Sequence, residues 1–356
     1  MLIVPGISLK SLNPRFWDNQ SEYYLPQAKA LMVSYADFHA SRTARKRAMD
    51  NGIHEFLGVP RGRVQVFLDN GAFKALSKEW HVRESDYTKF VEEAKPDWYP
   101  IPKDYIPAPS MSTQKQRGFY QRTMKMNEAY RHDGYVPILH VGRYLENYLE
   151  SIKQNPQLGQ KKEFGLGGLV PNLLRSPNAP AHDEIIESIM NVRKKLAGKR
   201  IHVFGIGGVS TLHVAALLQL DSMDSSGWRN RAIRGIIQLP GTGDRQVAKL
   251  GNWNVREVSK REIEELRSCT CPSCTRYGLN GLKKNKTEGF NNRAIHNLYI
   301  LFEEVALIQR HLEKNSYETW YQKHLTNSIY KPLVDKILAT KNQEPSKIRA
   351  NSKIRA

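Results

Sequence analysis

The stretch Cys269–Cys274, which reads CTCPSC, contains every cysteine of this 356-residue chain. Because no cysteine lies elsewhere, the three thiols have no distant partners for a disulfide framework. The spacing C-x-C-x2-C brings three thiolates to one tight turn, which Pro272 helps to fix, and such a turn suits a single tetrahedral metal ion. The pattern therefore predicts a closed structural zinc site with ligands from Cys269, Cys271 and Cys274, and this site needs a fourth ligand from elsewhere in the chain.

A histidine near the start of a downstream helix is the best candidate for the fourth ligand. Apolar residues recur at helical spacing through NRAIHNLYILFEEVALIQRHL and mark one buried face. His296 lies near the beginning of this segment, with 21 residues between it and Cys274. His311 and His324 are competitors further along, and a histidine at a helix start also serves as a cap or a surface residue. The sequence favours His296.

The chain carries a large excess of positive charge, with 54 Lys and Arg against 35 Asp and Glu and a formal net charge of +19. Such an excess attracts polyanions, above all nucleic acid, through counterion release, whereas evenly scattered charge serves only solubility. Here the basic residues cluster, which favours nucleic acid. Contacts with the nucleic-acid backbone are expected from Arg42, Arg45, Arg229, Arg231, Lys283 and Lys284.

The sequence predicts a cytoplasmic protein with no membrane partner. No apolar run approaches the roughly 18 residues that a membrane crossing needs. The N-terminal MLIVPGISLK has no basic region ahead of its short apolar run, so it is expected to form a first strand and not a signal peptide. Cysteines that are few and clustered fit a reducing compartment.

Short apolar runs rich in strand-forming residues recur through the first two thirds of the chain and are separated by helix-like segments. They are LIVPGI, ALMVSYA, VQVFL, DWYPIP, YVPILHV, EFGLGGLV, IHVFGIGGV and IRGIIQL. Strands that alternate with helices form parallel βα units, and about eight such units predict an α/β fold, an irregular (β/α)8 TIM barrel with an added zinc-binding module. A doubly wound open sheet is the alternative.

The expected organisation has four parts. The catalytic barrel spans residues 1–260, and the zinc-binding module with its packing helix spans 261–315. A helical segment follows over 316–340, and a basic, disordered tail with the repeat SKIRA-N-SKIRA covers 341–356.

Carboxylates and glycines stand where several predicted strands end. Asp69 follows VQVFL, Asp104 follows DWYPIP, and Asp224 ends LLQLDSMD. Active sites of parallel barrels lie at this end of the strands, so three carboxylates are expected to face one cavity. Carboxylates there suit a reaction that builds positive charge or moves a proton, although an isolated Asp is often a helix cap and an isolated Gly a turn residue. Glycines let a flat ligand lie against the backbone.

In this order, the segments resemble the tRNA-guanine transglycosylase superfamily. Asp69-Asn70-Gly71-Ala72-Phe73 is similar to the family's Asp-Ser-Gly-Gly-Phe motif. Gly167-Gly168-Leu169 is similar to its base-binding loop, and Phe204-Gly205-Ile206-Gly207 to a further glycine-bearing strand end. Leu220-Asp221-Ser222-Met223-Asp224 resembles the stretch that carries the nucleophile. The three cysteines followed by Ile295-His296-Asn297-Leu298 resemble the family's zinc site. The resemblance covers residues from about 60 to 315.

The resemblance implies a base exchange on a guanosine nucleotide. Asp224 would attack the anomeric carbon and form a covalent glycosyl–enzyme intermediate, which an incoming 7-deazaguanine base then resolves. Asp69 would transfer protons. Asp104, with Asp97 as its competitor, would read the donor edge of the base. The Gly168–Leu169 peptides would read its carbonyl edge. The expected substrate-contacting residues are Asn70, Phe73, Asp104, His140, Gly167, Gly168, Leu169, Phe204 and Gly205.

Several departures from the tRNA enzymes predict DNA as the substrate. The family's Thr-Arg-x-Gly segment and the Pro-Thr-Arg run after the nucleophile are missing, and no C-terminal RNA-binding domain is expected. The base loop lacks the glutamate that accompanies an aminomethyl-bearing base, which indicates a nitrile base such as preQ0. The chain thus most resembles the divergent DpdA-type DNA-guanine transglycosylases, including phage-encoded ones, which implies partner proteins of a DNA-modification system. The alternatives are a tRNA-guanine transglycosylase and a non-catalytic barrel that binds nucleic acid.

Overall fold

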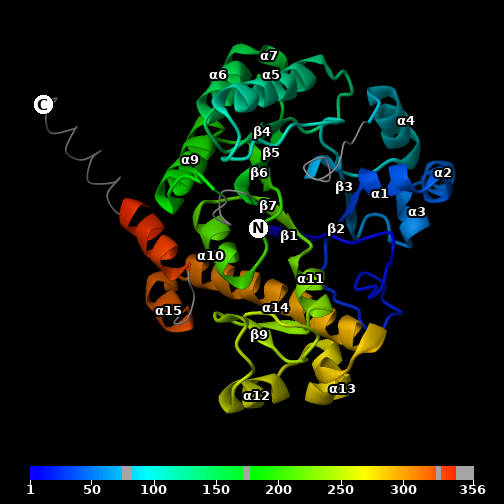
Figure 1. The fold of residues 1–356 in the computed structure, drawn as a ribbon, viewed down its shortest axis with the longest axis vertical. Helices are drawn as coiled ribbons and strands as arrows, with labels where there is room; N and C mark the ends of the chain where they lie inside the picture. Colours follow the sequence, from blue (N-terminus) through cyan, green and yellow to red (C-terminus); the bar gives the residue numbers. More distant parts are fainter. Residues whose placement is uncertain (74–81, 171–176, 326–329, 342–356) are drawn as a thin grey trace, which may run out of the picture.

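Parallel β-strands at the centre and helices around them define an α/β fold (Figure 1). The computed structural model describes residues 1–73, 82–170, 177–325 and 330–341. The parallel strands are β1 (Leu2–Pro5), β2 (Ala30–Ser34), β3 (Gln65–Asp69), β4 (Ile138–His140), β5 (Glu163–Gly167), β6 (Arg200–Val203) and β7 (Ser222–Ser225). The central sheet has the order β1-β7-β6-β5-β4, and β2 pairs with β3 separately.

Single parallel bridges connect these two groups of strands. Gly6, just after β1, bridges to Met32 in β2. Phe67 in β3 bridges to Trp98, and Pro100 bridges to Val136 just before β4. The predicted strand DWYPIP thus contacts its neighbours through isolated bridges and forms no regular ladder among the described residues.

The run IRGIIQL was predicted to be a parallel strand, and this prediction is wrong. It contributes β8 (Ile236–Leu239), which pairs antiparallel with β9 (Gly243–Gln246). Three residues, 240–242, join the two strands, and so short a connection permits only an antiparallel pair. In the central sheet β7 pairs with both β6 and β1, which places Asp224 in the sheet.

Helices alternate with the strands along the chain and lie around them (Figure 1). In Figure 1 the first helices lie beside β2 and β3, and the long helix α14 passes between the sheet and the β8–β9 hairpin. A further helix covers residues 331–341. The labelled helices are α1 (Tyr35–Ala40), α2 (Arg42–Asn51), α3 (Ile53–Leu57), α4 (Glu84–Ala94), α5 (Thr113–Ala129), α6 (Leu145–Gln154), α7 (Pro156–Gly159), α9 (His182–Lys195), α10 (Val209–Leu217), α11 (Gly227–Ile233), α12 (Lys260–Arg267), α13 (Pro272–Lys283), α14 (Lys286–Glu313) and α15 (Tyr317–His324).

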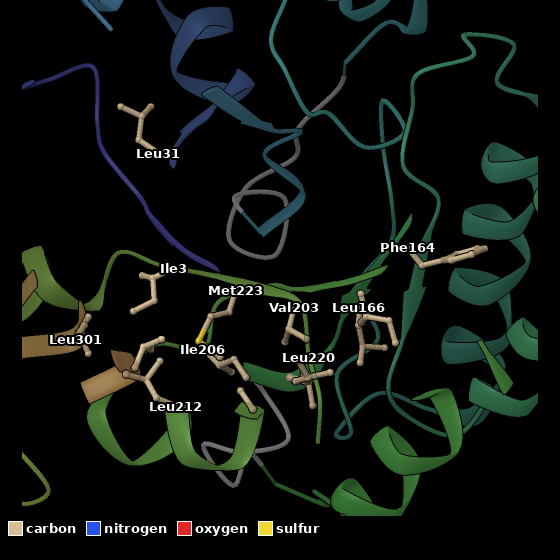
Figure 2. Packing of buried hydrophobic residues seen from close by; sticks show 14 of the residues in the cluster. Ile3, Leu31, Phe164, Leu166, Val203, Ile206, Leu212, Leu220, Met223 and Leu301 are labelled. Atoms are coloured by element: carbon tan, nitrogen blue, oxygen red, sulfur yellow. The ribbon is translucent and has the colours of Figure 1, made fainter. Parts of the chain in front are cut away.

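The two faces of the strands fill two separate apolar clusters. Side chains such as Ile3, Val203 and Met223 belong to the large cluster between the strands and the helices (Figure 2). Side chains of the opposite face form a smaller second cluster, whose members are Val4, Ala30, Met32, Phe67, Trp98 and Val136. Successive side chains of a strand point to opposite faces, so one strand serves both clusters. The second cluster, called the inner cluster below, lies next to the strand ends that carry Asp69 and Asp224.

A third cluster joins the β8–β9 hairpin to the cysteine-bearing segment. Ile237 and Leu239 of β8 pack with Leu266, Leu282 and the cysteines. The boundary expected at residue 260 remains a prediction, and residues 342–356 of the expected tail lie outside the described residues. Among the described helices, none has both the length and the apolar character that a membrane crossing requires.

Candidate active site and metal centre

A cavity of about 950 Å³ opens at the carboxyl ends of the strands. Its lining includes Asp69, Asp104 and Asp224, which the sequence placed at three strand ends. The predicted contact residues Asn70, Phe73, Gly167, Gly168, Phe204 and Gly205 also line it. Phe73 is 59% exposed, so its ring is largely open to solvent. The volume lies within the range of about 300–1,000 Å³ that is typical of small-molecule sites.

Asp69 has the environment of a proton-transfer group. Its Oδ2 accepts hydrogen bonds from the Ser34 hydroxyl at 2.9 Å and from the Gly71 N–H at 3.0 Å. Burial raises the pKa of Asp69 to about 7, and the negative charges of Asp224 and Asp104 contribute to the rise against those two hydrogen bonds. A carboxyl group with a pKa near neutrality can both donate and accept a proton at physiological pH.

The raised pKa predicts that Asp69→Asn stabilises the folded protein at alkaline pH. The ordinary carboxyl value is 3.8 and the folded value is about 7, so the folded state retains a proton that the unfolded chain has lost. The stability from this protonation is complete below about pH 4 and is lost as pH rises through 7. Asparagine cannot ionise. The variant should therefore gain about 1–3 kcal/mol over wild type at pH 8 and little at pH 4.5, as measured by chemical denaturation.

The exposed Asp50→Asn on α2 controls for simple loss of a negative charge. An equal effect of Asp69→Asn at both pH values would contradict the assigned environment of Asp69.

Asp224 stands at the end of β7 with its carboxylate toward the cavity. Its Oδ1 accepts the Gly205 N–H at 2.9 Å. Gly205 has a φ of +76°, and a Cβ atom there would lie 2.6 Å from a methyl carbon of Val170, so this contact requires glycine. The competing residue Asp221 lies at the other end of β7, where its Oδ2 binds Arg193 at 2.9 Å. Asp221 is not part of the cavity lining.

Asp104 rather than Asp97 is the second carboxylate at the cavity. One Asp104 oxygen accepts the Asn70 side-chain N–H at 2.8 Å, and the other lies 2.7 Å from His140 Nε2. His140 is buried behind Asp104 and is not itself in the lining. Asp97 instead binds His54 at 2.7 Å near the amino-terminal end of β3, where it also accepts the Val66 N–H, and it is not in the cavity lining. The described contacts therefore support His140 as a partner of Asp104, while its contact with a substrate stays a prediction.

His202 on β6 is a site residue that the sequence analysis missed. Its Nε2 lies 3.4 Å from Asp224 Oδ1, and its Nδ1 lies 2.9 Å from the Ser222 hydroxyl. The available signal was alternation along the strand. Ile201 and Val203 face the helices, so the polar residue between them must point to the opposite face of the sheet.

The three cysteines and His296 converge on one point. His296 Nδ1 lies 3.6 Å from the sulfur of Cys269, 3.7 Å from that of Cys271 and 3.4 Å from that of Cys274. Metal–sulfur and metal–nitrogen bonds of about 2.3 and 2.0 Å at a tetrahedral angle separate nitrogen and sulfur by about 3.5 Å. The observed distances match this separation, and a single Nδ1 cannot hydrogen-bond to three sulfurs at once. The four residues form a group that could hold a metal ion.

The surroundings of His296 fix which of its nitrogens faces the cysteines. Its Nε2 lies 3.0 Å from the Gln238 carbonyl oxygen, which can only accept, so Nε2 carries a proton and Nδ1 is the nitrogen that faces the cysteines. The neighbouring Asn297 accepts the Gln238 N–H at 2.7 Å and donates to the Trp228 carbonyl at 3.1 Å. The motif Ile295–Leu298 thus contributes both His296 to the cysteine cluster and hydrogen bonds to the hairpin beside it.

The sequence profile of the queuine tRNA-ribosyltransferase family matches residues 20–329. The chain belongs to this family.

Relatives of this family member carry the description tRNA-guanine(15) transglycosylase. That of Aeropyrum pernix is 24% identical over 74% of this chain and 48% of its own length. That of Methanococcus aeolicus is 25% identical over 75% of this chain and 39% of its own length. That of Pyrococcus abyssi is 25% identical over 79% of this chain and 45% of its own length. The chain spans about half the length of the curated relatives it matches.

The two competing zinc ligands considered from the sequence, His324 and His311, have other partners in this transglycosylase-family chain. His324 and His213 each place Nε2 2.7 Å from the same oxygen of Glu304. A histidine nitrogen and a carboxylate oxygen that bind the same tetrahedral metal ion would be about 3.3 Å apart. The nitrogen–oxygen distances of 2.7 Å therefore indicate hydrogen bonds. Hydrogen bonds from the two histidines hold the pKa of Glu304 below its ordinary value, although burial opposes this. His311 binds the Ser316 hydroxyl at 2.8 Å.

One sequence prediction needs correction in this family member. Arg229 was expected at the nucleic-acid backbone, but it is buried and donates to the carbonyl oxygens of Asn13 and Ser11 at 2.9 and 3.1 Å. Leu169 directs its side chain into the core, so only its backbone is left for a ligand, and the expected contact of the Gly168–Leu169 peptides with the base stays a prediction.

The remaining predicted backbone contacts differ in their surroundings. Arg231 lines the cavity and pairs with Asp244 at 2.7 Å. Arg42 and Lys283 are exposed, Arg45 is partly buried, and Lys284 pairs with Glu288 at 2.5 Å. Their contacts with nucleic acid stay predictions.

Proposed function

We propose that this chain is a guanine transglycosylase that exchanges a guanine in nucleic acid for another base through a covalent intermediate on Asp224. The observation that carries the proposal is one cavity at the strand ends that holds Asp224, Asp104 and an Asp69 of raised pKa. A nucleophilic carboxylate, a proton-transfer group and a polar contact for the base are the three functions that such an exchange requires.

The reaction divides into two displacements. The Asp224 carboxylate attacks the anomeric carbon of the target guanosine, and the electrons of the bond to the base leave with guanine. Protonated Asp69 supplies a proton to the departing base and becomes a carboxylate. The incoming base then returns a proton to Asp69 and attacks the same carbon, which breaks the bond to Asp224. Two inversions give net retention at the sugar.

Asp104 is proposed to recognise the base. Asn70 and His140 hold its two oxygens, so the carboxylate keeps one orientation toward the cavity. An ionised carboxylate accepts hydrogen bonds from adjacent donors such as those on one edge of guanine. The glycine backbone at 167, 168 and 205 leaves room for a flat ligand, and Phe73 at the lining offers a ring face.

The proposal also includes a closed barrel of strands and a zinc ion bound by the cysteine cluster. The bridges Gly6–Met32, Phe67–Trp98 and Pro100–Val136 support closure of the strands into one irregular (β/α)8 barrel. The tetrahedral spacing of the cysteines and His296 supports one structural zinc ion. Zinc would stabilise the fold of the hairpin and helices around it, with no part in bond making.

Transfer RNA is the better supported substrate. The described relatives are tRNA-guanine(15) transglycosylases, and none of those three is described as acting on DNA. The DNA substrate predicted from the missing motifs has no support from these comparisons. The partner proteins, the 7-deazaguanine base and the phage-encoded origin rest on the sequence resemblance alone, and the cytoplasmic setting rests on the composition and the clustered cysteines.

A competition between substrates tests the proposed function. Purified protein and preQ0 are mixed with equal amounts of total tRNA and duplex DNA, each pool is digested, and its deazaguanosine is measured. We expect product in tRNA, because the relatives act on tRNA and because duplex DNA must first unstack the guanine at a cost of a few kcal/mol. Product in DNA alone would restore the DNA prediction. Product in neither, together with salt-dependent binding of both, would support the non-catalytic alternative.

A further inference from the structure

His202 occupies a buried position next to the proposed nucleophile. It lies in the middle of β6, with no exposed surface, and its ring packs against residues of the inner cluster. The ring centroid lies 4.8 Å from Trp98, 5.7 Å from Phe67 and 4.9 Å from Phe204. An imidazole in such an apolar setting is costly unless both of its nitrogens bind polar groups.

Only one of the two nitrogens has a normal hydrogen bond among the described residues. Nδ1 lies 2.9 Å from the Ser222 hydroxyl, which faces His202 across the parallel ladder between β6 and β7. Nε2 is buried and has no hydrogen-bond partner in the described part of the chain. The carboxylate of Asp224 approaches Nε2, with Oδ1 at 3.4 Å.

The charge of Asp224 selects the tautomer. If Nε2 presented a lone pair, it would face a carboxylate oxygen and repel it. If the Ser222 hydroxyl donates to Nδ1, then Nε2 carries the proton and directs it toward Asp224. A gap of 3.4 Å requires only a small movement of either side chain, and hydrogen bonds of active sites often shorten when substrate binds.

We propose that His202 is a positioning residue for Asp224, and this inference rests on the proposed function. The His202 Nε2–H and the Gly205 N–H hold Oδ1 from two directions. The other carboxylate oxygen, Oδ2, then points at the anomeric carbon and forms the bond. Ser222 acts behind the histidine by fixing its ring and tautomer.

The same two donors serve both displacements. In the first, they orient the carboxylate and compensate its charge beside an apolar cluster. In the intermediate, Oδ1 is the carbonyl oxygen of the glycosyl ester, and hydrogen bonds to it make the carboxylate a better leaving group. Loss of the Nε2 donor should therefore slow both steps without changing how tightly the nucleic acid binds.

The test compares full-length variants of one side chain. His202→Phe keeps a ring of similar size but removes both nitrogens, whereas His202→Gln keeps one N–H donor. The single-turnover rate of adduct formation at saturating nucleic acid, kcat and KM for guanine exchange, and thermal stability are measured for each. His54→Gln, which changes a buried histidine bonded to Asp97 outside the cavity, controls for the loss of a buried histidine.

We expect His202→Phe to lower adduct formation and kcat by about 10- to 100-fold with KM unchanged, the effect of losing one hydrogen bond to a charged group. His202→Gln should recover most of the rate, and His54→Gln should leave it unchanged. If His202→Phe forms the adduct as fast as wild type, or if His202→Gln is as slow as His202→Phe, the positioning role is wrong while the transglycosylase function stands. If wild type forms no adduct with any nucleic acid, the proposed function fails and this inference fails with it.

Discussion

Replacement of Asp224 by alanine is expected to abolish guanine exchange and any denaturation-resistant adduct with nucleic acid. Without the carboxylate no covalent bond to the sugar can form, so the incoming base has no glycosyl–enzyme intermediate to attack. We expect exchange to fall by at least about 10³- to 10⁴-fold, the usual consequence of removing a covalent nucleophile. Radiolabelled guanine incorporation measures exchange, and a denaturing gel with labelled nucleic acid detects the adduct.

Asp221→Asn is the matched control for this result. Asp221 lies three residues earlier on the same segment, but its carboxylate binds Arg193 and the Ile201 N–H, away from the cavity. The control variant should exchange guanine at nearly the wild-type rate. Wild-type exchange by Asp224→Ala, with loss of activity in Asp221→Asn, would assign the nucleophile to Asp221 instead.

Cys271→Ser is expected to remove the metal and to destabilise the protein strongly. Cys271 is fully buried, and its sulfur contacts the His296 nitrogen and the Cys274 N–H. Serine is a poor zinc ligand at neutral pH, and a structural zinc site contributes its binding energy to folding. We expect a loss on the order of 5 kcal/mol in unfolding free energy and a fall from one zinc per chain to none. Elemental analysis and denaturant titration measure the two effects.

Ser273→Ala in the same turn separates metal loss from a general disturbance of the turn. The Ser273 hydroxyl is buried and has no hydrogen-bond partner in the described part of the chain, so its removal should leave zinc and stability nearly unchanged. Purified wild-type protein that contains no metal, and that melts like Cys271→Ser, would refute the zinc site.

Spacing made the convergence of the three cysteines and His296 predictable from sequence. Three cysteines in one turn allow few alternatives, and helical periodicity identified which histidine begins a buried face. The strand-end carboxylates Asp69 and Asp224 were predictable for a similar reason, because parallel strands bring their carboxyl ends to one edge. In both cases a local pattern determines a position in space.

Partners across space were not predictable from sequence. The run that forms β8 has the same apolar pattern whether its neighbour is parallel or antiparallel, so periodicity could not identify β9. A cluster of basic residues in the sequence likewise does not show which partner each side chain binds. Arg229 and Arg231 lie in one basic run, yet the first binds backbone carbonyls of the N-terminal segment and the second lines the cavity. Alternation along the strand could have placed His202 on the inner face, but its pairing with Ser222 required knowledge of the strand register.

Gln238 connects the proposed metal site to the cavity wall through a single residue. Its carbonyl oxygen holds His296, its N–H binds Asn297, and its side chain lines the cavity. If a chelator removed the metal ion and His296 moved, Gln238 and the cavity wall beside Arg231 would therefore move with it. Chelators should consequently behave as inhibitors of this protein at concentrations too low to unfold it, and substrate that stabilises the wall should in turn slow the escape of the metal.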